Sequence, residues 1–182
     1  MKDLSLHILD IAQNSISAKA TFIEILLVED TLNDLFSITI RDNGCGMSKE
    51  TLEKVVDPYY TSRTTRKVGL GIPLLKQNAE RCEGHFSITS KENKGTELMA
   101  TFRYNNIDRP ALGDIAGVIV ILATSNPKID FVYTHRYNSK EYCFDTREVT
   151  KALEGTPIND LKVTRFLKEM VKENLDEIQI EE

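Results

Sequence analysis

The stretch RDNGCGM, Arg41 to Met47, decides how this sequence is interpreted. It follows LFSITI at 35–40, an apolar run rich in β-branched residues, and precedes SKETLEKVV at 48–56. It puts one acid, Asp42, at the end of a predicted strand, followed by an Asn-Gly step typical of turns. By itself the stretch fits a strand-ending turn, a metal loop or the wall of a pocket. The choice depends on which partners the rest of the chain offers to Asp42.

The composition is that of an ordinary globular protein. The chain has 182 residues, of which 41% are apolar and 28% are charged, enough for one domain or one domain with a small appendage. The net charge of −5 and the lack of a basic tract argue against nucleic acid or a membrane surface as partner. The cysteines, Cys45, Cys82 and Cys143, are scattered, which indicates neither a disulfide framework nor a zinc site. We expect a cytoplasmic protein.

Hydrophobic periodicity predicts an α+β chain up to residue 104. Helices are expected at 4–18, at 49–56 with Ser48 as its cap, and at 70–83. The long segment 57–67 has no period and is expected to be a loop. Apolar runs with many β-branched and aromatic residues predict the strands, which are 21–29, 35–41, 85–90 and 96–104.

The composition shifts at 105–114, which we interpret as a linker between a unit at 1–104 and a small α/β module at 115–182. In the module, strands are predicted at 115–124, 129–137 and 141–145, and helices at 146–155 and 157–174. The last helix is expected to bury one apolar face, made of Leu161, Phe166, Leu167, Met170 and Val171. The acidic end, 173–182, is expected to be a solvated tail.

Polar residues form a stripe along the first predicted helix. His7, Asp10, Asn14 and Ser17 fall on one face, and Asp10 is the one charged residue between Leu4 and Ala18. A solvent-exposed face would normally carry Lys and Glu, so the pattern favours a face that looks into a cleft. Carboxylate and amide oxygens one turn apart suit Mg²⁺.

A glycine pair precedes the third predicted helix, in VGLGIPLLK at 68–76. Gly69 and Gly71 would let backbone N–H groups approach an anion at the positive end of the helix. A tight loop explains the glycines equally well, but three cations stand just upstream: Arg63, Arg66 and Lys67. Together with the polar stripe they favour a phosphate site that is neither a P-loop nor a dinucleotide-binding fingerprint.

Beside a phosphate site, RDNGCGM could form the wall of a pocket for the base of a nucleotide. A carboxylate at a strand end, that of Asp42, can accept a hydrogen bond from an exocyclic amine such as that of adenine. Gly44 and Gly46 would let the backbone lie close to a flat base, and Met47 offers a polarisable apolar wall. Thr96, in KGTEL at 94–98, supplies a hydroxyl at the start of a strand.

The order D-x-x-x-N, DNGxGM, DPYYTSR, GLGI and KGT resembles the GHKL superfamily of gyrase, chaperone, histidine-kinase and mismatch-repair ATPase domains. The resemblance covers about residues 4–104. DPYYTSRTT followed by GLGIPLLKQNAERCEGHFSI is most similar to the catalytic domain of nitrogen-regulation-type histidine kinases. It implies the Bergerat fold, a two-layer α/β sandwich in which helices cover one face of a mixed sheet.

The resemblance also implies individual roles. Asn14 would hold Mg²⁺ against the triphosphate, and Asp42 would bind the adenine amino group, supported through water by Thr96. Asp10 would stand where hydrolytic members carry a glutamate general base, although it is one methylene shorter. Residues 57–71 would form the ATP lid. The other implied ATP contacts are Gly44, Gly46, Met47, Tyr59 or Tyr60, Arg63 or Lys67, Gly69, Leu70 and Gly71.

Six residues precede His7, so we expect no phosphoacceptor hairpin in this chain, and phosphate transfer would go to another protein. The first hypothesis is a stand-alone Mg-ATP-binding regulatory protein that phosphorylates a partner or uses ATP as a conformational switch. The alternatives are a slow ATPase with lid-gated association and a non-catalytic nucleotide sensor or adaptor. A protein partner would bind through residues 105–182 or the lid. Whether the chain is an enzyme stays open at this point.

Overall fold

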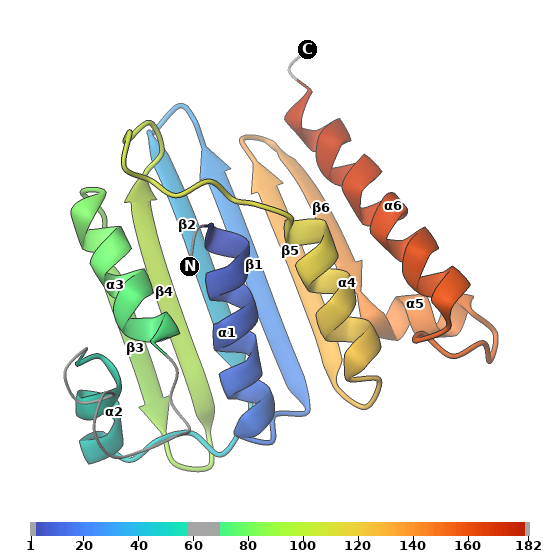
Figure 1. Ribbon diagram of the computed structural model, residues 1–182, viewed down its shortest axis with the longest axis horizontal. Helices are drawn as coiled ribbons and strands as arrows, with labels where there is room; N and C mark the ends of the chain where they lie inside the picture. Colours follow the sequence, from blue (N-terminus) through green and yellow to red (C-terminus); the bar gives the residue numbers. More distant parts are fainter. Residues whose placement is uncertain (1–2, 58–69, 181–182) are drawn as a thin grey trace.

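The computed structural model describes residues 3–57 and 70–180, which form a six-stranded sheet with helices over one face (Figure 1). The strand order is β3-β4-β2-β1-β5-β6, and every neighbouring pair is antiparallel except β1 and β5. This is the two-layer α+β fold that the resemblance implied, and the prediction is confirmed. The strands are β1 (Phe22–Asp30), β2 (Leu35–Asp42), β3 (Phe86–Lys91), β4 (Gly95–Arg103), β5 (Asp130–Tyr137) and β6 (Lys140–Asp145).

The helices lie on one side of the sheet, with α1 at the centre of the layer between α3 and α4 (Figure 1). Among residues 3–57 and 70–180, no helix combines the length and apolar character that crossing a membrane requires. The helices are α1 (Leu4–Ser17), α2 (Lys49–Val55), α3 (Gly71–Arg81), α4 (Ile115–Ser125), α5 (Thr146–Ala152) and α6 (Leu161–Gln179).

Alternation along β2 fixes the direction of its last side chain. Phe36, Ile38 and Ile40 are buried beneath the helices, and successive side chains of a strand point to opposite faces. Asp42 has the same parity and therefore faces the helical layer. The register pairs Asp42 with Thr96 on β4, so both polar groups lie at the same end of the sheet.

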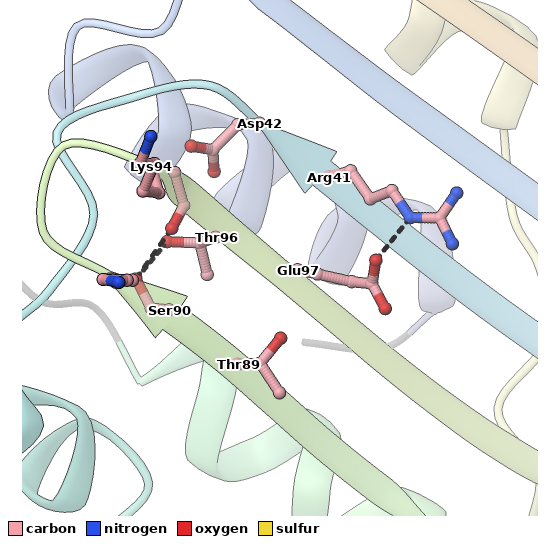
Figure 2. A pocket seen from close by; sticks show the side chains of 9 residues that line it. Arg41, Asp42, Thr89, Ser90, Lys94, Thr96 and Glu97 are labelled. Carbon is pink, nitrogen blue, oxygen red and sulfur yellow. Dashed lines mark hydrogen bonds and ion pairs between the residues drawn. The ribbon is translucent and has the colours of Figure 1, made fainter.

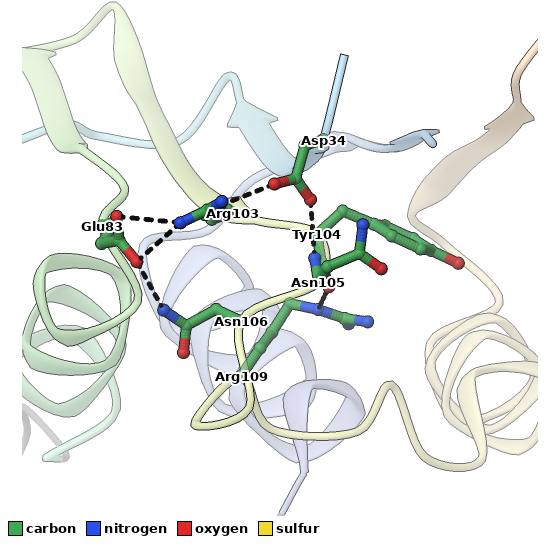
Figure 3. A network of polar contacts seen from close by, with 7 residues as sticks. All are labelled: Asp34, Glu83, Arg103, Tyr104, Asn105, Asn106 and Arg109. Atoms are coloured by element: carbon green, nitrogen blue, oxygen red, sulfur yellow. Dashed lines mark hydrogen bonds and ion pairs between the residues drawn. The ribbon is translucent and has the colours of Figure 1, made fainter. Parts of the chain in front are cut away.

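The segment between β4 and α4 is tied to the rest of the molecule at several points (Figure 3). The carboxylate of Asp34 accepts from Arg103 Nε at 2.6 Å and from the backbone N–H of Asn105 at 2.8 Å. The guanidinium of Arg109 lies 4.9 Å from the ring centroids of both Phe36 and Tyr104. These contacts hold the first half of residues 105–114 against the end of the sheet.

The second half of this segment covers the beginning of α1. The carbonyls of Ala111 and Leu112 accept from the backbone N–H groups of Leu4 and Ser5, at 2.9 and 2.8 Å. Asp3 caps the next free N–H group, that of Leu6. After this segment and α4, β5 pairs with β1. The predicted linker at 105–114 therefore connects two parts of one continuous sheet.

Residues 115–124, predicted as a strand, form the helix α4 instead. The many β-branched residues favoured a strand, but the run is long and apolar on nearly every side, and periodicity cannot distinguish a buried helix from a buried strand. The helix begins because Asp114 accepts from the N–H of Gly117 at 2.9 Å. Burial between α1, α6 and β5 then stabilises it.

The end of the chain also differs from the prediction. Residues 173–179 continue α6 rather than forming a solvated tail, because Leu175 and Ile178 extend the buried spacing of Leu167 and Val171. At the other end of the helix, Leu161 and Phe166 were predicted in the core and are exposed.

A buried polar cluster joins β1, β5 and α6. His135 is fully buried, and its Nε2 lies 2.7 Å from the carboxylate of Glu29, while its Nδ1 lies 2.8 Å from the hydroxyl of Tyr133. Gln179 of α6 donates to the same Glu29 oxygen at 3.4 Å. Burial, assisted by the nearby Glu29, raises the pKa of Tyr133 well above its usual value.

Replacement of His135 by leucine should destabilise the protein strongly, because it removes the partner that lies 2.7 Å from the buried Glu29 carboxylate, to which Gln179 donates at the longer distance of 3.4 Å. We expect the free energy of unfolding to fall by about 3–5 kcal/mol, measured by urea denaturation. The control is Arg136→Ala, which breaks an exposed ion pair with Glu141 and should cost less than about 1 kcal/mol. Equal losses in the two variants would contradict this account.

The loop that contains Gly46 is attached on both sides. Cys45 donates its N–H to the carbonyl of Ala18 at 2.8 Å, and its own carbonyl accepts from the N–H of Asn93 at 2.7 Å. Gly46 has φ of 64°, and a Cβ there would lie 2.0 Å from the carbonyl oxygen of Lys91. The glycine is therefore required both by its backbone conformation and by the close β3–β4 turn.

Gly46→Ala should destabilise more than Gly155→Ala, although both residues have positive φ. At Gly155, whose φ is 96°, no atom lies within 4 Å of the added Cβ, so the cost is the left-handed backbone alone, about 1–2 kcal/mol. At Gly46 the clash with fixed backbone adds about 1–3 kcal/mol. Thermal or urea unfolding of the two variants gives the comparison, and similar midpoints would show that the loop is not held as described.

Candidate functional site

A cavity of about 310 Å³ lies between α1, α2 and the ends of β2, β3 and β4. This volume is that of a small-molecule site, and the mixture of apolar walls with a few polar groups is typical of one. Its apolar lining is Ile11, Ala18, Ile40, Met47, Val55, Ile72, Ile88 and Leu98. Its other lining residues are Asn14, Ser15, Ser17, Asp42, Cys45, Gly46, Thr51 and Thr96.

Asp42 is held at the wall of this cavity by two donors. Its Oδ2 accepts from the hydroxyl of Ser15 at 2.6 Å, and its Oδ1 accepts from the N–H of Gly44 at 2.8 Å. An ionised carboxylate accepts only, and each oxygen has a second acceptor position. Asp42 is therefore oriented to receive a donor from the cavity, as an amino group would provide.

The hydroxyl of Thr96 is fixed beside Asp42 through Ser90. The hydroxyls of Ser90 and Thr96 lie 2.9 Å apart, and Ser90 also accepts from the N–H of Met47 at 2.9 Å. Sequence reasoning did not single out Ser15 or Ser90. The available signal was positional: Ser15 follows Asn14 on the same helix, and Ser90 has the parity of Ile88 at the end of β3.

The glycines of RDNGCGM bring the backbone close to the cavity. A Cβ on Gly44 would lie 2.8 Å from the carbonyl of Ala18 and 3.0 Å from Asp42 Oδ1. Gly46 and Met47 line the cavity itself, and Met47 packs on the core. Gly44, Gly46, Met47, Asp42 and Thr96 are thus brought together, as the sequence suggested.

A second, wider opening lies around the β3–β4 turn (Figure 2). Its volume of about 390 Å³ is larger, but it is less enclosed, and it shares Asp42 and Thr96 with the first cavity. Its central groups already pair: Arg41 Nε lies 2.5 Å from Glu97 and its Nη1 3.2 Å from Glu24. Arg41 and Glu97 alternate with Asp42 and Thr96 and so point to the other face. We therefore take the more enclosed cavity beneath α1 as the site.

Three buried polar atoms on α1 have no partner in the described part of the chain: His7 Nδ1, Asp10 Oδ2 and Asn14 Nδ2. Such atoms are costly to bury and commonly mark the place of a water, an ion or a ligand. Burial lowers the pKa of His7, which favours the neutral ring. The predicted polar stripe therefore faces inward along most of its length, although Ser17 at its end is exposed.

The first turn of α3 lies directly against Asp10. A Cβ on Gly71 would lie 1.9 Å from Asp10 Oδ2. No side chain of the described residues caps this helix, which begins after Leu70, and Pro73 has no N–H group. An uncapped helix N-terminus attracts anions, so this turn offers a position for phosphate next to Asp10 and Asn14.

The donor set also fits a magnesium ion. Mg²⁺ prefers oxygen ligands and usually keeps phosphate oxygens and waters with one or two protein groups. Asn14 and Asp10 could supply such oxygens. In residues 3–57 and 70–180, no cluster of three His, Cys, Asp or Glu side chains could hold a metal alone. Four predicted contacts, Tyr59, Arg63, Lys67 and Gly69, lie outside the described residues, as does most of the expected lid.

The sequence is similar to sensor proteins of bacteria. It is 29% identical over 97 residues to a sensor protein of Shewanella frigidimarina, covering 52% of this chain and 15% of that protein. It is 32% identical over 91 residues to the sensor histidine kinase YvrG of Bacillus subtilis, covering 48% of this chain and 15% of that protein. The chain thus matches less than a fifth of the length of each of these two relatives.

The fold is also found in a solved structure, the N-terminal domain of a DNA repair protein. The TM-score is 0.57 at 20% identity, covering 79% of this chain and 52% of that one. The family described as histidine kinase-, DNA gyrase B- and HSP90-like ATPase matches residues 2–106, more than half of the chain. The chain therefore belongs to this family, the GHKL superfamily that its motifs resembled.

Proposed function

We propose that this chain binds Mg-ATP in the cavity beneath α1 and acts as a regulatory protein. The observation that carries the proposal is the orientation of Asp42, whose two oxygens are held by Ser15 and Gly44 with acceptor capacity facing the cavity. An adenine amino group is a donor of the kind that such a carboxylate selects. Thr96, aligned with Asp42 across β2 and β4, supports the same edge of the base through water.

The phosphates would extend from the base toward Asn14, Asp10 and the first turn of α3. In this proposal Asn14 holds Mg²⁺, which would neutralise part of the negative charge of the phosphates. The free N–H groups at the start of α3 receive the terminal phosphates. Leu70 and Gly71 belong to this turn, and Tyr59, Arg63, Lys67 and Gly69 are proposed contacts from the preceding segment.

Asp10 is the proposed general base. Its Oδ2 is buried without a partner and lies against Gly71, so it is available to orient an attacking water or a partner's hydroxyl. Two outcomes of ATP binding fit this arrangement: transfer of phosphate to a partner protein, and slow hydrolysis that resets a conformational switch. A non-catalytic sensor or adaptor would need Asp42 and Asn14 but not Asp10.

A protein partner would bind through residues 105–182 or through the lid at 57–71. Leu161 and Phe166 on α6 are large apolar side chains that are 87% and 62% exposed. This exposure supports the 105–182 surface as the place of contact. A cytoplasmic location remains part of the proposal.

Asp42→Asn should weaken ATP binding about ten- to one-hundredfold, which corresponds to the loss of one charged hydrogen bond. The matched control is Glu97→Gln, which changes an acid on the neighbouring strand that points to the opposite face. Calorimetric titration with Mg-ATP measures both variants. GTP should compete poorly with ATP in the unaltered chain, because guanine presents a carbonyl where adenine presents the amine. Equal affinities for ATP and GTP would contradict the assignment of Asp42.

Asp10→Asn separates catalysis from binding. If the chain hydrolyses ATP, phosphate release should fall at least about a hundredfold, as is usual on removal of a general base, while ADP affinity changes less than about threefold. Phosphate release that persists in the variant would exclude Asp10 as the base. Binding without release in the unaltered chain would favour the sensor, and transfer of labelled phosphate to a purified partner would favour the kinase.

A further inference from the structure

His7 lies on the polar stripe of α1 but does not line the cavity, so it does not contact the base in the proposed complex. Its side chain is only 1% exposed. It stands one turn beyond Asp10, on the side away from Asn14, and packs toward α3 rather than toward the sheet end. Its side chain is therefore part of the contact between α1 and α3.

One side-chain hydrogen bond links the two helices at this point. The amide Nδ2 of Asn78 lies 3.2 Å from His7 Nε2. With the amide in this orientation Asn78 donates, so Nε2 accepts and a neutral ring carries its proton on Nδ1. Nδ1–H is then a buried donor without a partner in the described residues.

The backbone of Gly71 is close enough to oppose the fall in the pKa of His7 that burial causes, but it does not reach hydrogen-bond geometry. His7 thus contacts Asn78 and lies near Gly71, two positions of α3 that are seven residues, about two helical turns, apart. A small approach of α3 toward α1 would give Nδ1–H its acceptor.

Such a movement of α3 would change the contact between Gly71 and the carboxylate of Asp10. Gly71 already lies so close to Asp10 Oδ2 that not even a methyl group fits between them. We infer that His7 and Asn78 are positioning residues that set the first turn of α3 against Asp10 and that this placement makes the site favour a nucleoside triphosphate over a diphosphate. The inference rests on the proposed function, and it concerns the end of the nucleotide farthest from Asp42.

The test compares two ligands rather than activity. Calorimetry with Mg²⁺ gives the dissociation constants of ADP and of a non-hydrolysable ATP analogue for the unaltered chain and for Asn78→Ala. We expect Asn78→Ala to weaken binding of the analogue about five- to tenfold and that of ADP less than twofold. Gln77→Ala, an exposed neighbour on the same helix, should change neither constant.

His7→Gln is the second variant, since glutamine can still meet Asn78 but cannot supply the Nδ1–H group. It should lower the preference for the analogue in the same direction as Asn78→Ala. An unchanged ratio of the two constants in Asn78→Ala, or an equal loss for both ligands, would overturn the inference and leave an ordinary packing role. If the unaltered chain bound neither nucleotide, the proposed function itself would fall, and the inference with it.

Discussion

The hydrogen bond between Ser15 and Asp42, 2.6 Å long, joins the two layers of the molecule at the point on which the rest of the site depends. It exists because successive side chains of β2 point to opposite faces, so that Asp42 lies on the same face as the buried Phe36, Ile38 and Ile40 and meets α1 there. Asp10 is the one formally charged residue of α1, and the neighbouring helices α3 and α4 cover the two flanks of this helix. The result is a carboxylate with fixed orientation in a largely apolar cavity.

Residues beyond the family match contribute to this arrangement without touching the cavity. The carbonyls of Ala111 and Leu112 complete the first turn of α1, and α4 packs along its side. The cluster around Glu29 and His135 fixes β5 and α6 to β1. The polar face of α1 is therefore positioned from both sides, by α3 near the proposed phosphates and by the C-terminal elements behind it.

Much of the fold and of the candidate site could be predicted from the sequence, because hydrophobic periodicity and turn residues indicate the same elements in residues 4–104. The placement of Asp42 at a strand end and of Gly71 at a helix start are examples. Prediction failed where tertiary contacts decide: α4 is an apolar run whose β-branched residues favour a strand, and α6 continues through a charged end because Ile178 finds a buried position. Ser15 was missed because its role depends on a hydrogen bond to Asp42, 27 residues away, which no local sequence pattern indicates.

The most direct measurement of the central claim is a crystal structure of the chain grown with ADP and Mg²⁺. The account predicts the adenine amino nitrogen within hydrogen-bond distance, about 2.7–3.2 Å, of the Asp42 carboxylate. It also predicts the phosphates beside Asn14 and the first turn of α3. A nucleotide bound elsewhere, or a base turned so that Asp42 meets no donor, would contradict it.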